Sequence, residues 1–147
     1  RNYYKIINKD ERVVHAGINL CFKKGINYSW NKFTRNSSVH FQLLTTLHEC
    51  SAVSWRCLLI SRKKYLEVSG FEENHLGDFF ADVDLCLSLI KLNYVNILTP
   101  FAVMRDTGNA DIEPERDYEK LFILHKHSDL VLKDPCSVQK LNSCLDI

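Results

Sequence analysis

The segment from residue 69 to residue 84 holds the densest group of reactive side chains in the sequence. It runs into a predicted helix, and its acidic residues are Glu72, Glu73, Asp78, Asp82 and Asp84. A carboxylate at the edge of a cleft can act as a general base that takes a proton from a hydroxyl group. The alternative is structural, because the helix dipole stabilises acidic groups near a helix N-terminus, which would make Asp78 or Asp82 a helix cap.

Helical geometry limits which of these carboxylates can work together. Residues 80–93 predict a helix, because Phe80, Val83, Leu87 and Ile90 follow the spacing of one apolar stripe. Residues two apart on a helix are separated by about 200°, so Asp82 and Asp84 cannot both face one substrate. Both flank the apolar stripe, and the periodicity does not choose between them.

The other polar clusters predict no metal site and no phosphate loop. The stretches 48–50 (His-Glu-Cys) and 125–127 (His-Lys-His) do not match a zinc spacing, so their histidines are interpreted as structural or surface residues. The five glycines are scattered, which excludes a Gly-rich phosphate loop. The net charge is only +1, and the basic residues around Lys23 are too widely spaced to form a nucleic-acid-binding patch, so we do not expect nucleic-acid binding.

Size and composition predict one globular domain. The chain has 147 residues, of which 46% are hydrophobic and 25% charged, as in an ordinary folded protein. Its apolar runs are too short to span a bilayer. The six cysteines are irregularly spaced, and those at 57 and 86 lie in apolar runs, so we expect mostly reduced core thiols in a cytosolic protein. The sequence opens without methionine or a signal peptide, and we expect a fragment of a longer protein.

Strand and helix patterns alternate along the chain. Residues 2–20 predict a hairpin, and residues 52–60 predict a buried strand that is broken by Trp55-Arg56. Residues 62–68 predict a short helix stopped by Gly70, and residues 95–98 a strand ended by Pro100, with another extended piece at 101–104. A last helix is predicted over residues 115–132. Mixed elements in this order predict an α/β or α+β domain.

Several of these segments, in this order, resemble the C-terminal, acceptor-side half of family-2 glycosyltransferases with the GT-A fold. The resemblance starts with a His-Ala-Gly stretch at 15–17 and continues through residues 51–62, 65–73, 81–87, 93–94 and 99–102. An Asp-Pro pair at 134–135 is similar to rhamnosyltransferase-like and O-antigen-type members. The resemblance implies a partial glycosyltransferase-like domain over residues 1–135, followed by a tail at 136–147.

The resemblance also implies an activity and a set of site residues. The activity is inverting sugar transfer from a nucleotide-sugar to a glycan or lipid-linked acceptor, in cell-surface polysaccharide synthesis. It would occur in the cytoplasm or at the cytoplasmic face of the membrane, with Mn²⁺ or Mg²⁺ in the complete enzyme. Asp82 would be the catalytic base and Asp106 a metal ligand. The expected substrate contacts are Trp55, Arg56, Asp84 and Arg105.

The sequence also departs from the family pattern. The nucleotide-binding half with its D-x-D motif would precede residue 1, so we expect this chain alone to be inactive. Ala81 stands where the family has Glu or Asn, Trp55-Arg56 replaces a pair of small residues, and Ser88 replaces an arginine. These departures favour an alternative, a non-catalytic glycosyltransferase-like module that serves as a binding or assembly surface. An unrelated α/β interaction domain is the third hypothesis.

Overall fold

A computed structural model describes residues 3–9, 13–15, 17–21, 25–27, 45–77, 80–107 and 117–132. The described part is a mixed α/β structure, as the sequence predicts. The predicted cap Asp78, the Asp-Pro pair at 134–135 and the tail at 136–147 lie outside the described residues.

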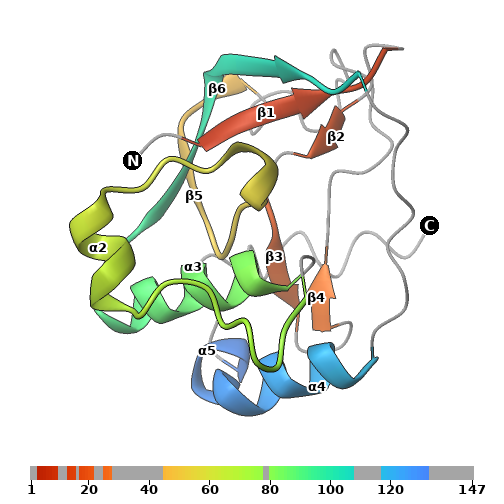
Figure 1. The fold of residues 1–147 in the computed structure, drawn as a ribbon. Coiled ribbons are helices and arrows are strands. Elements are labelled where there is room, and N and C mark those ends of the chain that lie inside the picture. Colours follow the sequence, from red (N-terminus) through yellow and green to blue (C-terminus); the bar gives the residue numbers. More distant parts are fainter. Residues whose placement is uncertain are drawn as a thin grey trace.

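A four-stranded mixed sheet lies above the helices in Figure 1. Its order is β2 (Val13–His15), β1 (Tyr3–Ile7), β6 (Asn96–Arg105) and β5 (His48–Cys50). Strands β1 and β6 are parallel, and the two outer strands are antiparallel to their neighbours.

The predicted N-terminal hairpin is confirmed only for β1 and β2. The chain leaves β2 after His15 and passes through Gly17, whose φ of +96° is available mainly to glycine. Strand β3 (Asn19–Cys21) then pairs with β4 (Gly25–Asn27) in a separate two-stranded sheet. Residues 13–20 are therefore not one strand.

The prediction that Pro100 ends a strand is wrong, because β6 continues through it. The pairing of β6 with β1 jumps from Tyr4–Thr99 to Lys5–Val103, so Pro100 lies inside an irregularity of the ladder. On the other side, β5 pairs only with residues 96–98 of β6. At this position β6 does not need the backbone N–H that proline lacks.

The predicted strand at residues 52–60 is also wrong. Strand β5 ends at Cys50, and Ala52 forms an isolated bridge with Ile18. The chain then makes a 3₁₀ turn at Trp55–Cys57, capped by the Ser54 hydroxyl, which accepts the N–H of Arg56 at 3.4 Å. A serine hydroxyl that accepts a backbone N–H two residues further on favours a turn over a strand, although the flanking residues are apolar.

The predicted helices at 62–68 and 80–93 are confirmed as α2 (Arg62–Glu67) and α3 (Ala81–Lys91). Gly70 follows α2 with a φ of +74°, as expected for the residue that stops it. Helix α3 ends where Asn93 takes a left-handed φ of +59° and the Tyr94 N–H bonds to the Leu89 carbonyl.

The predicted last helix is two helices in the described range, α4 (Asp117–Lys126) and α5 (Ser128–Leu132), which are separated at His127. Helix α3 lies between the sheet and this pair (Figure 1), and its residues Val83 and Leu87 are buried in the main core with Leu98 and Ile123. Cys50 and Cys86 are buried free thiols, as predicted, whereas the free thiol Cys57 is only partly buried and does not belong to the core.

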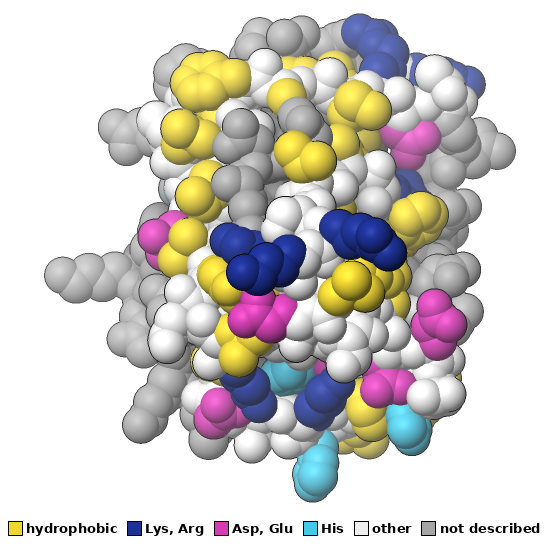
Figure 2. Space-filling model, turned by 60° about the vertical axis from the view of Figure 1, so that its left-hand side comes forward, with side chains coloured by type: hydrophobic (Ala, Val, Ile, Leu, Met, Phe, Trp, Pro, Cys, Tyr) yellow, Lys and Arg dark blue, Asp and Glu magenta, His cyan; other side chains and the backbone are white. Residues whose placement is uncertain are grey.

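The described surface has no strongly one-sided charge on the face in Figure 2. Lysine and arginine side chains alternate there with acidic and hydrophobic ones. Within the ranges given above, none of the helices has the length and apolar character needed to cross a membrane.

Truncation of the core stripe is expected to destabilise the fold. Leu87 is 0% exposed, so Leu87→Ala should lower the free energy of unfolding by about 2–5 kcal/mol through lost burial and a cavity. The matched control is Leu66→Ala on α2, where the leucine is 59% exposed and the change should stay within about 0.5 kcal/mol. Urea denaturation of both variants measures the difference, and equal losses would contradict the assignment of α3 to the core.

Candidate functional site

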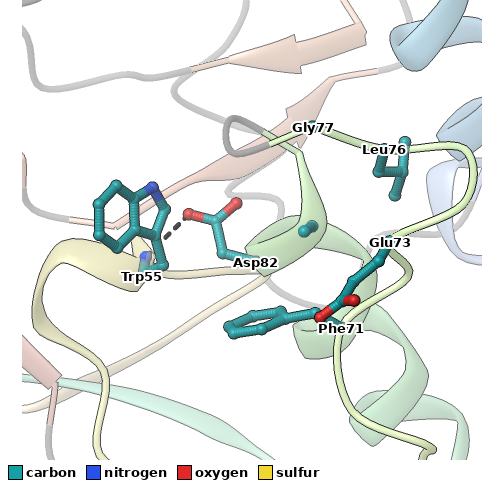
Figure 3. A pocket seen from close by; sticks show the side chains of 7 residues that line it. Trp55, Phe71, Glu73, Leu76, Gly77 and Asp82 are labelled. Carbon is teal, nitrogen blue, oxygen red and sulfur yellow. Dashed lines mark hydrogen bonds between the residues drawn. The ribbon is translucent and has the colours of Figure 1, made fainter.

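A pocket of about 540 Å³ opens at the N-terminal end of α3. Three segments form it: the turn at 55–57, the loop at 71–77 and the first turn of α3 (Figure 3). The described residues that line it are Trp55, Phe71, Glu73, Leu76, Gly77, Ala81 and Asp82. Its volume and its mixture of apolar and acidic side chains are typical of a small-molecule site.

Asp82 is the buried acidic group of this pocket. Its side chain is 2% exposed, and its two oxygens accept backbone N–H groups from Trp55 at 2.8 Å and from Val83 at 2.7 Å. Figure 3 shows the carboxylate turned toward the backbone of Trp55. Of the two carboxylates that the helical periodicity leaves as alternatives, Asp82 is among the lining residues and Asp84 is not.

Asp84 lies on the other side of α3, as the 200° separation predicts. Its carboxylate contacts the Nε2 atom of His127 at 2.7 Å and the Nζ atom of Lys126 at 2.9 Å. Burial alone would raise the pKa of Asp84, but the hydrogen bonds from His127 and Lys126 and their positive charges outweigh it and lower the pKa. The observed contacts of Asp84 therefore join α3 to the junction of α4 and α5.

Trp55 and Arg56 point to different places. The indole ring of Trp55 is 52% exposed at the pocket, so it does not fill it. The guanidinium group of Arg56 donates to the Asp106 carboxylate at 3.0 Å. The backbone N–H of Asp106 in turn donates to the Ile7 carbonyl at 2.8 Å, which fixes this residue at the end of β6. Arg105, exposed beside it, is also at that end.

The described residues do not fit a divalent metal. Nowhere in the described ranges do three or more His, Cys, Asp or Glu side chains gather as ligands. Asp106, the ligand that the resemblance implies, already binds a cationic partner in Arg56. A hard cation prefers several oxygen ligands, which Asp106 alone does not supply.

His15 fixes the position of the turn that holds Asp82. Its buried Nε2 atom accepts the N–H of Ser54 at 2.9 Å and that of Gly17 at 3.3 Å. Burial, together with the nearby charge of Arg56, lowers the pKa of His15 from 6.5 to about 4. The ring is therefore neutral at pH 7, with its proton on Nδ1. A hydrogen-bonded path thus runs from His15 through Ser54 and Trp55 to Asp82.

Tyr65 fixes the loop on the other side of the pocket. Its hydroxyl accepts the Phe71 N–H at 3.2 Å, and the two rings meet edge to face at 5.5 Å. A Cβ atom at Gly70 would lie 2.8 Å from the Tyr65 ring, so only glycine allows this approach. The loop turns Glu73 toward the pocket, whereas Glu72 accepts hydrogen bonds from the Asn74 backbone and pairs with His75.

The sequence pattern singles out neither His15 nor Phe71 as a site residue, and it does not distinguish Glu73 from Glu72. The contacts that define their roles join segments that are far apart in the sequence, such as Ser54 and His15. The one local signal was the His-Ala-Gly stretch, in which Gly17 permits the tight approach to His15.

The chain is similar to a curated protein of Sinorhizobium fredii (strain NBRC 101917 / NGR234) named "Uncharacterized protein y4gI". The two are 31% identical over 116 residues, which is 79% of this chain and 13% of the relative. The chain thus spans about an eighth of the length of the curated relative that it matches. No family model matches the chain, and no solved structure matches it.

The depressed pKa of His15 predicts a loss of stability in mild acid. Between pH 6.5 and about 4 the unfolded chain binds a proton at His15 that the folded chain does not, so stability falls by about 3 kcal/mol as the pH drops. Asp84, whose folded pKa is also lowered, contributes its own loss only below its ordinary value of 3.8. Urea denaturation at several pH values measures this slope.

The glutamine variant of His15 tests the assignment. His15→Gln keeps a hydrogen-bond acceptor without a titrating ring, so its stability should be nearly flat between pH 6.5 and 4. The control is His125→Gln, which replaces an exposed histidine on α4 and should keep the wild-type slope. A wild-type slope in the His15 variant would assign the pH dependence to another group.

Proposed function

We propose that the chain is the acceptor-side half of a family-2 glycosyltransferase with the GT-A fold, and that Asp82 is its general base. The observation that carries the proposal is the buried Asp82 carboxylate in the pocket at the start of α3. This is the position to which the sequence resemblance assigns the base. The sheet and α3 are compatible with that fold. The comparisons with known proteins give no information on whether the chain has it.

The chemistry follows from the contacts of Asp82. Each of its oxygens accepts a backbone N–H, and the carboxylate lines the pocket into which we propose that an acceptor hydroxyl binds. The hydroxyl proton moves to the carboxylate while the hydroxyl oxygen bonds to C1 of the donor sugar. The bond from C1 to the nucleotide diphosphate breaks, and the diphosphate leaves on the opposite face, which inverts the configuration at C1. The backbone bonds keep the carboxylate aimed during this step.

The donor side of the reaction would require residues outside this chain. The nucleotide and the divalent cation are expected in the complete enzyme, which would act in polysaccharide synthesis in the cytoplasm or at the cytoplasmic face of the membrane. Arg105 and Arg56 are the guanidinium groups of this chain that we propose for the diphosphate. Arg56 would exchange Asp106 for a phosphate oxygen in that step.

A non-catalytic saccharide-binding module is the second candidate. The ion pair between Arg56 and Asp106 favours it, because the two groups expected to meet phosphate and cation bind each other instead. The half-exposed Trp55 ring also suits a binding surface. The two candidates share the pocket and differ in whether Asp82 takes up a proton.

Replacement of Asp82 by asparagine separates the two candidates. In the full-length protein, Asp82→Asn should lower sugar transfer by about 10²- to 10⁴-fold, because the amide cannot accept the proton. It should lower the free energy of unfolding by only about 1 kcal/mol, since one of the two backbone bonds to the side chain is lost. Release of nucleoside diphosphate from UDP- and dTDP-sugars with Mn²⁺ measures transfer.

The matched control is Asp84→Asn. This change weakens the contacts with His127 and Lys126, so it should lower stability, yet the folded fraction should retain most of its transfer rate. Wild-type transfer in Asp82→Asn would reduce Asp82 to a structural residue and would favour the binding module.

A further inference from the structure

The charged side chains among the described residues of the pocket are all acidic, and this affects which saccharides it can accept. Glu73 and Asp82 are the charged residues among its described lining residues, and the others are apolar or glycine. Arg56, next to the lining residue Trp55, is paired with Asp106 in this structure and is not itself a lining residue. The charged side chains that the described lining residues offer a ligand are therefore two carboxylates.

The two carboxylates differ in exposure and in partners. Asp82 is buried and held by two backbone N–H groups, whereas Glu73 is exposed, and within the described structure no hydrogen bond or ion pair engages its carboxylate. Glu72, the adjacent residue in the same loop, is instead tied to His75 and Asn74. Figure 3 shows Glu73 beside Phe71, on the loop opposite the 55–57 turn.

We propose that Glu73 is a specificity-determining residue that makes this pocket select uncharged saccharides and reject acidic ones. The proposal deepens the proposed function and rests on it, because it names the class of acceptor for the same site. Carboxylates only accept hydrogen bonds, so Glu73 and Asp82 suit the hydroxyl donors of a neutral sugar. The rings of Trp55 and Phe71 offer apolar area for the C–H faces of such a sugar.

Like-charge repulsion supplies the discrimination. A uronic acid or a phosphorylated sugar would bring a third negative charge next to two carboxylates in a partly enclosed site. Screening at physiological salt acts over about 8 Å, so a charge seated inside the pocket is weakened little by it. A neutral sugar of the same shape meets no such repulsion, and we expect it to bind about tenfold more tightly than its acidic counterpart.

Methyl glucoside and methyl glucuronide are a suitable pair of probes, because they differ only in a hydroxymethyl group against a carboxylate. Saturation-transfer NMR titrations on the full chain at 0.15 M salt give their relative affinities. The wild-type chain should prefer the glucoside by about tenfold. Equal affinities, a preference for the glucuronide, or no binding of either probe would overturn the proposal.

Two glutamine variants locate the source of the preference. Glu73→Gln keeps the size of the side chain and should reduce the preference to about threefold or less. Glu72→Gln removes the same charge from the adjacent residue, which is not a lining residue, and should leave the preference unchanged. Equal changes in both variants would assign the effect to the general charge of the loop and would overturn the role of Glu73.

The outcome is distinguishable from that of the transfer experiment. If Asp82→Asn abolishes transfer in the full-length protein while both glycosides bind equally, the base assignment stands and the charge selectivity is wrong. If the glucoside is preferred and Asp82→Asn transfers at the wild-type rate, Glu73 selects ligands for a binding module and the proposed catalysis is wrong.

Discussion

The hydrogen bond from the Trp55 backbone to the Asp82 carboxylate is the contact on which the pocket depends. It joins two walls of the site, the 55–57 turn and the start of α3, which are 27 positions apart in the sequence. The turn is itself held by His15 from a third segment, through a bond that requires a neutral ring. A buried carboxylate without such partners would cost several kcal/mol, so the bond stabilises the fold and aims the side chain at once.

Helix α3 uses its two acidic residues in different ways because their surroundings differ. Asp84 contacts the Lys126 ammonium group and the buried imidazole of His127, and removing one partner of such a buried pair is costly. Asp82 accepts the backbone N–H groups of Trp55 and Val83 and lines the pocket. The first arrangement fixes the packing of α4 and α5 against α3, and the second is compatible with proton transfer. The same helix thereby separates a structural carboxylate from a candidate catalytic one.

Local patterns in the sequence predict the helices that surround the site better than the contacts inside it. The apolar stripe of α3 and the glycine after α2 are signals within one or two turns, and both are confirmed. The strand predicted at 52–60 fails because the serine cap and a distant carboxylate compete for its backbone N–H groups. The prediction that Pro100 ends the strand fails because β6 tolerates a proline where its pairing with β1 is irregular, and that irregularity depends on the partner strand. The roles of His15 and Glu73 also depend on distant segments. His15 contacts Ser54, and Glu73 lines a pocket together with Trp55, and the spacing of residues along the sequence does not predict either arrangement.

The pair of Arg56 and Asp106 does not by itself decide between catalysis and binding. Both side chains are about one-quarter exposed, at 25% and 23%, and ion pairs at such positions contribute about 0–1 kcal/mol. A diphosphate offers the same guanidinium a more highly charged partner and two hydrogen bonds in a fork, which outweighs so weak a pair. The ion pair is therefore compatible with either function, and the group that separates the two functions is the carboxylate of Asp82, which lines the pocket.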